Sequence, residues 1–296
     1  MALKLLTLVF LAFFCFSAKG QETREIYFKV PLNDCDTRHF PRGQNNAPVE
    51  DFAILKLPAT YSANGEPTRL VYMAHGAGGG VSANEWFLNQ FDLQRTLLEN
   101  GYAVFDVNGG GVENFGGPLV VSSAFKAYQY IVQNFNVYPR IIVGGFSMGG
   151  LSSTNFVYRH SAIVLGHVMY SPVLDLYGQA WKNPWLKSTR QAMAAVYQFG
   201  NVSEFDSCAV NGFNPIDEYT VNSTRGPLKP YPVPVKIWHG ARDPVVTVPT
   251  SRRFFEAVKR GGGDIELVEI DSDDHALSCG NESMNKELLL YIKRFK

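Results

Sequence analysis

The sequence predicts an α/β protein in which a mostly parallel sheet carries helices on both faces. Three observations predict it: apolar runs typical of buried strands alternate with segments of helical periodicity, glycine-rich turns end several of these runs, and the order strand, helix, strand repeats through most of the chain. In such sheets, ligands bind beyond the carboxyl ends of the strands. Residues that directly follow predicted strands are therefore the first candidates for a functional site.

The first part of the chain supplies an opening pair of strands and then the first strand-helix repeat. The opening strands are β-rich and partly alternating, whereas the third run is continuously apolar, which predicts a strand buried on both faces. It ends in His75 and a run of glycines. In chain order we expect strands at Glu25–Leu32, Asp51–Leu57 and Leu70–Ala74, a helix at Ala83–Asn100 and a strand at Tyr102–Val107.

The same alternation continues after the glycine-rich segment NGGGVENFGGP. Pro118 opens a helical pattern, as proline does at the first position of a helix. The expected elements are helices at Leu119–Phe135 and Leu151–His160 and strands at Ile141–Phe146 and Ala162–Tyr170, and later strands at Val235–Trp238 and Ile265–Ile270 and helices at Ser251–Arg260 and Glu282–Phe295.

Between the expected strands at Ala162–Tyr170 and Val235–Trp238, the segment Asp175–Pro234 does not alternate strands and helices and is rich in aromatic residues and proline. One interpretation is a cap-like insertion over the carboxyl edge of the sheet, where Trp181 and Trp185 would contact a substrate. An ordinary long loop with its own small aromatic core is an equal alternative.

The first 20 residues differ from the rest of the chain. Lys4 precedes an apolar run from Leu5 to Phe16, and the small-residue stretch Ser17–Gly20 follows. This pattern is typical of a secretory signal peptide, and the run is shorter than the ~20 residues that span a bilayer. We therefore expect an exported protein, extracellular or periplasmic, with one domain over residues 21–296 and no membrane span after cleavage.

Charge and cysteine content exclude several classes of protein. Lysine plus arginine equals aspartate plus glutamate at 27 each, without runs of one sign, so nothing predicts a nucleic-acid partner. After the signal, Cys35, Cys208 and Cys279 allow at most one disulfide, and Cys208–Cys279 is the first pairing to test. No metal-ligand spacing occurs, so we expect neither a metal nor a cofactor.

One strand end has the arrangement that a nucleophilic serine needs. The strand Ile141–Phe146 runs into G-F-S-M-G, in which Gly145 and Gly149 flank Ser147. At the tip of a tight strand-to-helix turn, side chains two residues before and after the serine would collide, and glycine removes both collisions. The bare pattern also arises by chance in a glycine-rich chain, so further residues must support it.

A serine hydroxyl needs a base, and the base needs an orienting partner. His275 follows the last predicted strand and Asp243 the strand before it, so both fall at the same edge as Ser147. Nearby Asp271, Asp273 and Asp274 compete with Asp243 as the orienting acid, although solvated loop positions suit them better. His75 and His239 are expected to have structural roles.

The motifs G-F-S-M-G, H-G-A-R-D-P-V-V and D-D-H-A, in this order, resemble the α/β-hydrolase superfamily. The resemblance covers about residues 25–295 and is nearest to secreted esterases and to prolyl-oligopeptidase-like or dienelactone-hydrolase-like branches. It implies the α/β-hydrolase fold, with Ser147 as nucleophile, His275 as general base and then acid, and Asp243 as the group that holds the imidazole.

The resemblance also implies an oxyanion hole made of two backbone N–H groups. The first is that of Met148, directly after the nucleophile. The second comes from the loop after the third strand, where Ala77 is the first choice and Gly78 the reserve. Gly78 is in addition a candidate substrate-binding residue.

We therefore expect a secreted serine hydrolase that cleaves an ester, with a small-molecule or polysaccharide-linked ester as substrate. A serine aminopeptidase or prolyl-oligopeptidase-like peptidase is the first alternative, and a non-catalytic binding module of the same fold is the second. The acyl group, the alcohol and the oligomeric state do not follow from the sequence.

Overall fold

The computed structural model describes residues 23–32, 50–81, 92–175, 193, 196, 230–277 and 282–295. The expected signal peptide, the three cysteines outside it, Trp181, Trp185 and nearly all of the expected insertion lie outside these ranges. The described elements are β1 (Arg24–Pro31), β2 (Glu50–Leu57), β3 (Arg69–Ala74), α3 (Asp92–Glu99), β4 (Tyr102–Val107), α4 (Pro118–Asn134), β5 (Ile141–Phe146), α5 (Met148–His160), β6 (Val164–Tyr170), β7 (Val235–Gly240), α10 (Pro249–Arg260), β8 (Ile265–Ile270) and α11 (Glu282–Lys293).

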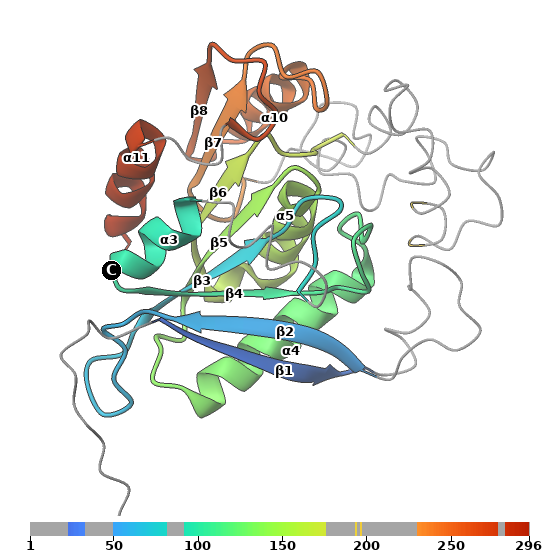
Figure 1. The fold of residues 1–296 in the computed structure, drawn as a ribbon. Helices are drawn as coiled ribbons and strands as arrows, with labels where there is room; N and C mark the ends of the chain where they lie inside the picture. Colours follow the sequence, from blue (N-terminus) through green and yellow to red (C-terminus); the bar gives the residue numbers. More distant parts are fainter. Residues whose placement is uncertain are drawn as a thin grey trace, which may run out of the picture.

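The described strands form one eight-stranded sheet in the order β1-β2-β4-β3-β5-β6-β7-β8 (Figure 1). β1 pairs with β2 and β2 with β4 in antiparallel orientation, and all later pairs are parallel. Every residue of β4, β5 and β7 is buried, as expected for parallel strands covered on both faces. The predicted mostly parallel sheet is therefore confirmed.

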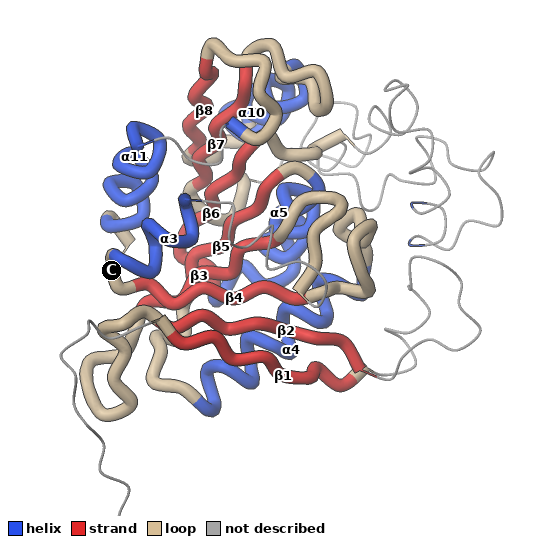
Figure 2. The backbone as a smooth tube through the Cα atoms, viewed as in Figure 1, coloured by secondary structure: helices blue, strands red, loops and turns tan. Residues whose placement is uncertain are grey.

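Helices cover both faces of this sheet. One face of the sheet is covered by α4, α5 and α10, and the other by α3 and α11 (Figure 2, helices in blue). Alternate residues of a strand serve the two faces: on β3, Leu70 and Tyr72 belong to the first core cluster and Val71 and Met73 to the second. None of the helices in the described ranges combines the length and apolar character needed to cross a membrane.

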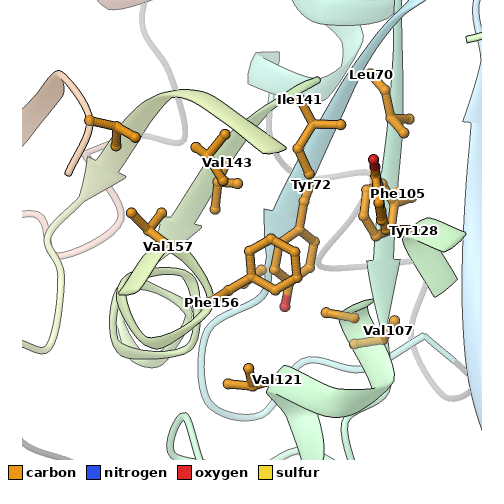
Figure 3. Packing of buried hydrophobic residues seen from close by; sticks show 14 of the residues in the cluster. Leu70, Tyr72, Phe105, Val107, Val121, Tyr128, Ile141, Val143, Phe156 and Val157 are labelled. Carbon is orange, nitrogen blue, oxygen red and sulfur yellow. The ribbon is translucent and has the colours of Figure 1, made fainter. Parts of the chain in front are cut away.

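Large aromatic side chains fill the core between the sheet and α5 (Figure 3). Tyr72 of β3 stacks on Phe105 of β4 with ring centroids 5.0 Å apart, and it contacts Phe156 of α5 at 5.2 Å. All three side chains are at most 1% exposed. Because these rings join two neighbouring strands to the helix that follows β5, they fix where the turn between β5 and α5 lies.

Three boundaries differ from the sequence-based expectation in ways that matter for the site. α5 begins at Met148 rather than Leu151, so the helix starts directly after Ser147. β7 continues to Gly240, so His239 lies within the strand and not in the following loop. A short 3₁₀ turn occupies Ser161–Ile163, and β6 starts only after it.

Candidate active site

Ser147 lies between β5 and α5 in a backbone conformation that is uncommon for a residue with a side chain, with φ 52° and ψ −118°. The two flanking glycines make this turn possible. A Cβ added to Gly145 would lie 2.1 Å from the carbonyl oxygen of Gly149, and one added to Gly149 would lie 2.1 Å from the carbonyl oxygen of Ala74. Side chains at both positions would therefore collide, as expected, and the atoms that they would meet belong to the backbone.

Neighbouring backbone groups hold Ser147 in this conformation, which costs on the order of 1–3 kcal/mol. Its N–H donates to the carbonyl of Tyr170 at 3.0 Å, and its own carbonyl accepts from the amides of Gly150 at 2.9 Å and Val173 at 2.8 Å. These bonds connect the turn to the end of β6. The serine is thus fixed by the sheet on one side and by its own helix on the other.

His275 and Asp243 form a hydrogen-bonded line with Ser147. The Nε2 atom of His275 lies 2.9 Å from Oγ of Ser147, and its Nδ1 atom lies 2.7 Å from Oδ2 of Asp243. The Asp243 side chain is fully buried, whereas that of His275 is 18% exposed. An ionised carboxylate only accepts, so Nδ1 of His275 carries a proton and the neutral ring accepts the serine proton at Nε2.

Four donors surround the Asp243 carboxylate. Oδ1 accepts from the amides of Val245 at 2.8 Å and Val246 at 3.0 Å, and Oδ2 faces His275 at 2.7 Å and Nε2 of His239 at 3.4 Å. Burial alone would raise the pKa of Asp243, but the contacts with His239, His275 and the Val246 amide lower it below its ordinary value. Asp243 is therefore a carboxylate at neutral pH.

Of the three competing acids next to His275, Asp273 is exposed and the other two have partners of their own. Asp271 pairs with Arg242, and Oδ1 of Asp274 accepts from the Ala276 amide at 2.9 Å. The loops after β7 and β8 are joined by backbone bonds, among them the Arg242 amide to the carbonyl of Ser272 at 3.0 Å. This pairing of loops brings Asp243, rather than Asp271 or Asp274, to the Nδ1 side of His275.

Phe146 is a contact that the sequence analysis missed. Its ring packs against the His275 imidazole with centroids 5.1 Å apart and an angle of 43° between the planes. A Cβ added to Gly76 would lie 2.8 Å from Cδ1 of the same ring, so glycine is required there for the loop to approach. Its place in the motif was the available signal, because Phe146 is the second residue of G-F-S-M-G and lies directly before the serine.

The expected oxyanion-hole amides belong to the residue after Ser147 and to the loop after β3, which comes close to Ser147: a Cβ added to Gly76 would lie 3.4 Å from the Ser147 Cβ. Met148 is the first residue of α5, so its N–H has no partner within the helix and belongs to the positive end of the helix dipole. Ala77 is exposed, and its N–H donates to no other residue in the described ranges. The N–H of Gly78 donates to the carbonyl of Val112 at 3.0 Å, which removes the reserve donor.

A buried polar network below this loop was also missed. Nδ1 of His75 lies 2.7 Å from Oδ2 of Asp106 in β4, and Nε2 lies 3.4 Å from Nδ2 of Asn114. Burial alone would lower the pKa of His75, but the carboxylates of Asp106 and Asp51 raise it above its ordinary value. Asp51 also accepts from the Gly109 amide at 2.8 Å, so the network holds the loop after β3 beside the glycine-rich loop after β4.

Candidate substrate contacts remain partly outside the described chain. Gly78 lies at the carboxyl edge with φ 85° and open space around it, whereas Trp181 and Trp185 fall in residues that the structure does not describe. Within the described ranges, no group of three or more histidine, cysteine, aspartate or glutamate residues has the arrangement of a metal site.

Comparison with solved structures identifies the fold. The chain is similar to an acylaminoacyl peptidase from Pyrococcus horikoshii, with a TM-score of 0.66 and 13% identity over 92% of this chain and 42% of that one. It is similar to an S-formylglutathione hydrolase from Agrobacterium tumefaciens, with a TM-score of 0.63 and 15% identity over 95% and 98% of the two chains. For the esterase Pf2001 from Pyrococcus furiosus, these values are 0.60, 17%, 93% and 93%.

These likenesses and the strand order show that the chain has the α/β-hydrolase fold, which confirms the resemblance read from the sequence at the level of fold. The chain spans about two fifths of the length of the acylaminoacyl peptidase. No family model and no curated protein sequence matches the chain.

Proposed function

We propose that this protein is a serine hydrolase that cleaves carboxylic esters through an acyl-enzyme intermediate. The observation that carries the proposal is the line of contacts from Ser147 Oγ to His275 Nε2 at 2.9 Å and from His275 Nδ1 to Asp243 Oδ2 at 2.7 Å. A base within hydrogen-bonding distance of a serine, itself oriented by a buried carboxylate, is the arrangement that activates a hydroxyl nucleophile.

In the first half-reaction, Ser147 Oγ attacks the carbonyl carbon of the ester while His275 Nε2 takes the serine proton. The charge that develops on the carbonyl oxygen is stabilised by the N–H groups of Met148 and Ala77. When the tetrahedral intermediate collapses, the bond to the alcohol oxygen breaks and His275 returns the proton to that oxygen. The products are the free alcohol and an ester between the acyl group and Ser147.

In the second half-reaction, water takes the place of the alcohol. His275 removes a proton from the water, whose oxygen attacks the acyl carbon, and the same two amides bind the second oxyanion. Collapse releases the carboxylic acid and returns the proton to Ser147. Asp243 remains ionised throughout and stabilises the imidazolium that forms in both steps. The whole reaction uses only groups of the protein, the ester and water.

Ester substrates are favoured by two similar structures, the S-formylglutathione hydrolase and the esterase, which the chain matches over 98% and 93% of their lengths. Peptidase activity is the second candidate, because an acylaminoacyl peptidase and a puromycin-hydrolyzing peptidase from Mycobacterium tuberculosis are also similar. Export of the mature protein and a pocket shaped by Trp181 and Trp185 belong to the same proposal. Acylated carbohydrate and small-molecule esters are the substrates to test first.

Hydrolysis of p-nitrophenyl esters and of aminoacyl-p-nitroanilides by the same preparation separates the candidates. We expect turnover of p-nitrophenyl acetate, with Ser147→Ala reducing kcat/KM by roughly a million-fold or to background. Turnover of the anilides with no ester hydrolysis would favour the peptidase, and inertness toward both would favour a binding module. A series of acyl chain lengths, with acetylated and feruloylated xylan, then defines the acyl group.

Ser171→Ala is the matched control for Ser147→Ala. Ser171 also has a positive φ, 41°, lies at the end of the neighbouring strand β6 and is fully buried. Its hydroxyl has no hydrogen-bond partner in the described part of the chain. Ester turnover should survive Ser171→Ala, and equal loss in both variants would point to damage of the strand ends rather than removal of a nucleophile.

A further inference from the structure

A second buried histidine lies directly behind the triad carboxylate. His239 is the fifth residue of β7, is 0% exposed and has its side chain among Asp243, Val246 and Ser251. Its Nε2 lies 2.7 Å from the carbonyl oxygen of Val246 and 3.4 Å from Oδ2 of Asp243, and its Nδ1 lies 2.7 Å from Oγ of Ser251. The side chain therefore has a polar contact at each ring nitrogen.

These partners define the tautomer. A carbonyl oxygen only accepts, so the proton of a neutral His239 must be on Nε2. Nδ1 then accepts from the hydroxyl of Ser251, which lies in α10 and is fully buried. The Nε2–H group consequently points to the side of the ring where Val246 and Asp243 lie.

The same group supports Asp243 by a second route. The Val246 amide donates to Oδ1 of Asp243 at 3.0 Å, while the Val246 carbonyl accepts from His239 at 2.7 Å. Asp243, Val246 and His239 thus close a ring of contacts around the turn that presents the carboxylate. Rotation of that carboxylate would break contacts at both of its oxygens.

We propose that His239 is a positioning residue, which fixes the Asp243 carboxylate through the Val246 carbonyl and through its own Nε2–H group. This inference rests on the proposed triad chemistry, because the orientation of Asp243 matters only if Asp243 orients His275. His239 holds Oδ2 in line with Nδ1 of His275 and so maintains the imidazole tautomer that accepts the Ser147 proton.

Two substitutions separate positioning from simple structural support. In His239→Gln, the side-chain amide reaches the region of Nε2 and keeps a donor for Val246 and Asp243. In His239→Asn, the shorter amide lies where Nδ1 was and leaves both without a donor. We expect His239→Gln to keep kcat/KM within about threefold and His239→Asn to lower it about tenfold, which corresponds to about 1.4 kcal/mol for a lost bond to a charged group.

His167 on the neighbouring strand β6 provides the matched control. It is also 0% exposed, and it contacts a serine hydroxyl, that of Ser153, at 2.9 Å and the Tyr231 hydroxyl at 3.0 Å. Within the described ranges, its side-chain contacts are with Ser153 and Tyr231 and not with Asp243 or His275. His167→Asn should lower the unfolding midpoint as much as His239→Asn does, yet leave kcat/KM per folded molecule unchanged.

The decisive readout is the proton nuclear magnetic resonance signal of the His275 Nδ1–H group, which reports the bond to Asp243 without requiring turnover. We expect this low-field signal to shift or broaden in His239→Asn and to keep its position in His239→Gln and His167→Asn. An unchanged signal in His239→Asn, or equal losses of kcat/KM in His239→Gln and His239→Asn, would overturn the positioning role.

Labelling of the unmodified protein with ¹⁵N-histidine keeps the test valid if a variant fails to fold. The nitrogen shifts should identify His239 as the Nε2–H tautomer, and an Nδ1–H tautomer would contradict the inference. If Ser147 proves unreactive while both spectroscopic results hold, the proposed hydrolase function fails and the positioning of Asp243 stands. If ester turnover depends on Ser147 and the His275 signal is unchanged in His239→Asn, the hydrolase function stands and the positioning role of His239 fails.

Discussion

Asp243 combines the two properties that its proposed role as orienting acid needs, a fixed direction and a negative charge at neutral pH. Its side chain is fully buried, two backbone amides hold Oδ1, and its pKa is lowered by His239, His275 and the Val246 amide against the effect of burial. Burying an ion is favourable only when such donors replace water. At the residue scale, the site therefore depends on the donors around the carboxylate as much as on the carboxylate itself.

Asp243→Asn should lower kcat for an ester substrate roughly a thousand- to ten-thousand-fold, because an amide donor facing Nδ1 favours the tautomer with the proton on Nε2. That proton would block the nitrogen that must accept from Ser147. Steady-state hydrolysis of p-nitrophenyl acetate measures the effect. Asp271→Asn is the control, since Asp271 is 87% exposed and pairs with Arg242, and wild-type kcat is expected for it.

His167 allows a prediction about pH and stability. Burial lowers the pKa of His167 to about 3, below its ordinary value of 6.5. The folded state thus favours the neutral ring, so this contribution to stability is complete above pH 6.5 and is lost as the pH falls toward 3. Over that window the free energy of unfolding should fall with a slope of up to ~1.4 kcal/mol per pH unit from this residue.

Urea denaturation of the wild type and of His167→Gln at a series of pH values measures that slope. Glutamine can keep the bond to Ser153 and does not titrate, so the variant should lose less stability than the wild type between pH 6.5 and 3. Parallel curves for the two proteins across this range would show that His167 is not the residue responsible.

At the scale of elements, the turn between β5 and α5 depends on close backbone approach. A Cβ on Gly149 would lie 2.1 Å from the carbonyl oxygen of Ala74 and 2.6 Å from that of His75, and neither backbone group can move without displacing the end of β3. The absence of a side chain at Gly149 therefore allows the turn at Ser147 to lie against the loop that carries Ala77. A side chain there would separate the two proposed oxyanion donors.

Gly149→Ala should therefore destabilise the protein by about 3 kcal/mol or more, through a steric overlap that the core cannot absorb. Gly262→Ala is the matched control, because Gly262 has φ 79° with nothing within 4 Å of an added Cβ. Backbone strain alone should cost about 1 kcal/mol there. Chemical denaturation of both variants gives the two values, and equal losses would mean that the close approach is not what constrains Gly149.

Elements were more predictable from the sequence than the contacts between them. Apolar runs and glycine turns predicted all eight described strands, and the ends of β5, β7 and β8 led to Ser147, Asp243 and His275, which lie in hydrogen-bonding contact. The pairing of His75 with Asp106 was not predictable. It joins residues 31 positions apart and depends on the parallel register of β3 with β4, which local periodicity does not encode.

His239 shows the same limit in another form. Its position near a strand end predicts a structural role, and its contact with the Val246 carbonyl agrees with that. Its contact with Oδ2 of Asp243 arises only because β7 continues to Gly240 and the chain then turns back over the strand. The expected strand ended two residues earlier, at Trp238, so the contact between His239 and Asp243 was not predicted.

At the scale of the whole molecule, the proposed site is assembled from distant parts of the chain by the sheet. Ser147 and His275 are 128 positions apart in the sequence, and parallel pairing brings the ends of their strands to one edge. The aromatic core packs β3 and β4 against α5, the helix that begins directly after Ser147 (Figure 3). The geometry of the site should therefore fail together with the core rather than before it.

Phe156→Ala tests this dependence. Removing a fully buried ring that contacts Tyr72 should lower the free energy of unfolding by about 3–5 kcal/mol. The midpoint for loss of ester hydrolysis should move with the midpoint of unfolding measured by fluorescence. Tyr158→Ala on the same helix is the control, since Tyr158 is 50% exposed and little change is expected. Loss of hydrolysis well before unfolding would show that the site is less dependent on the core.

The most direct test of the central claim is mass-spectrometric mapping of a fluorophosphonate adduct. The proposed chemistry predicts one adduct per chain, on Ser147, formed rapidly in the wild type and in Ser171→Ala, and absent in Ser147→Ala and His275→Ala. An adduct on another residue, or a wild-type protein that stays unmodified while a known serine hydrolase in the same tube is labelled, would contradict the assignment of Ser147 as an activated nucleophile.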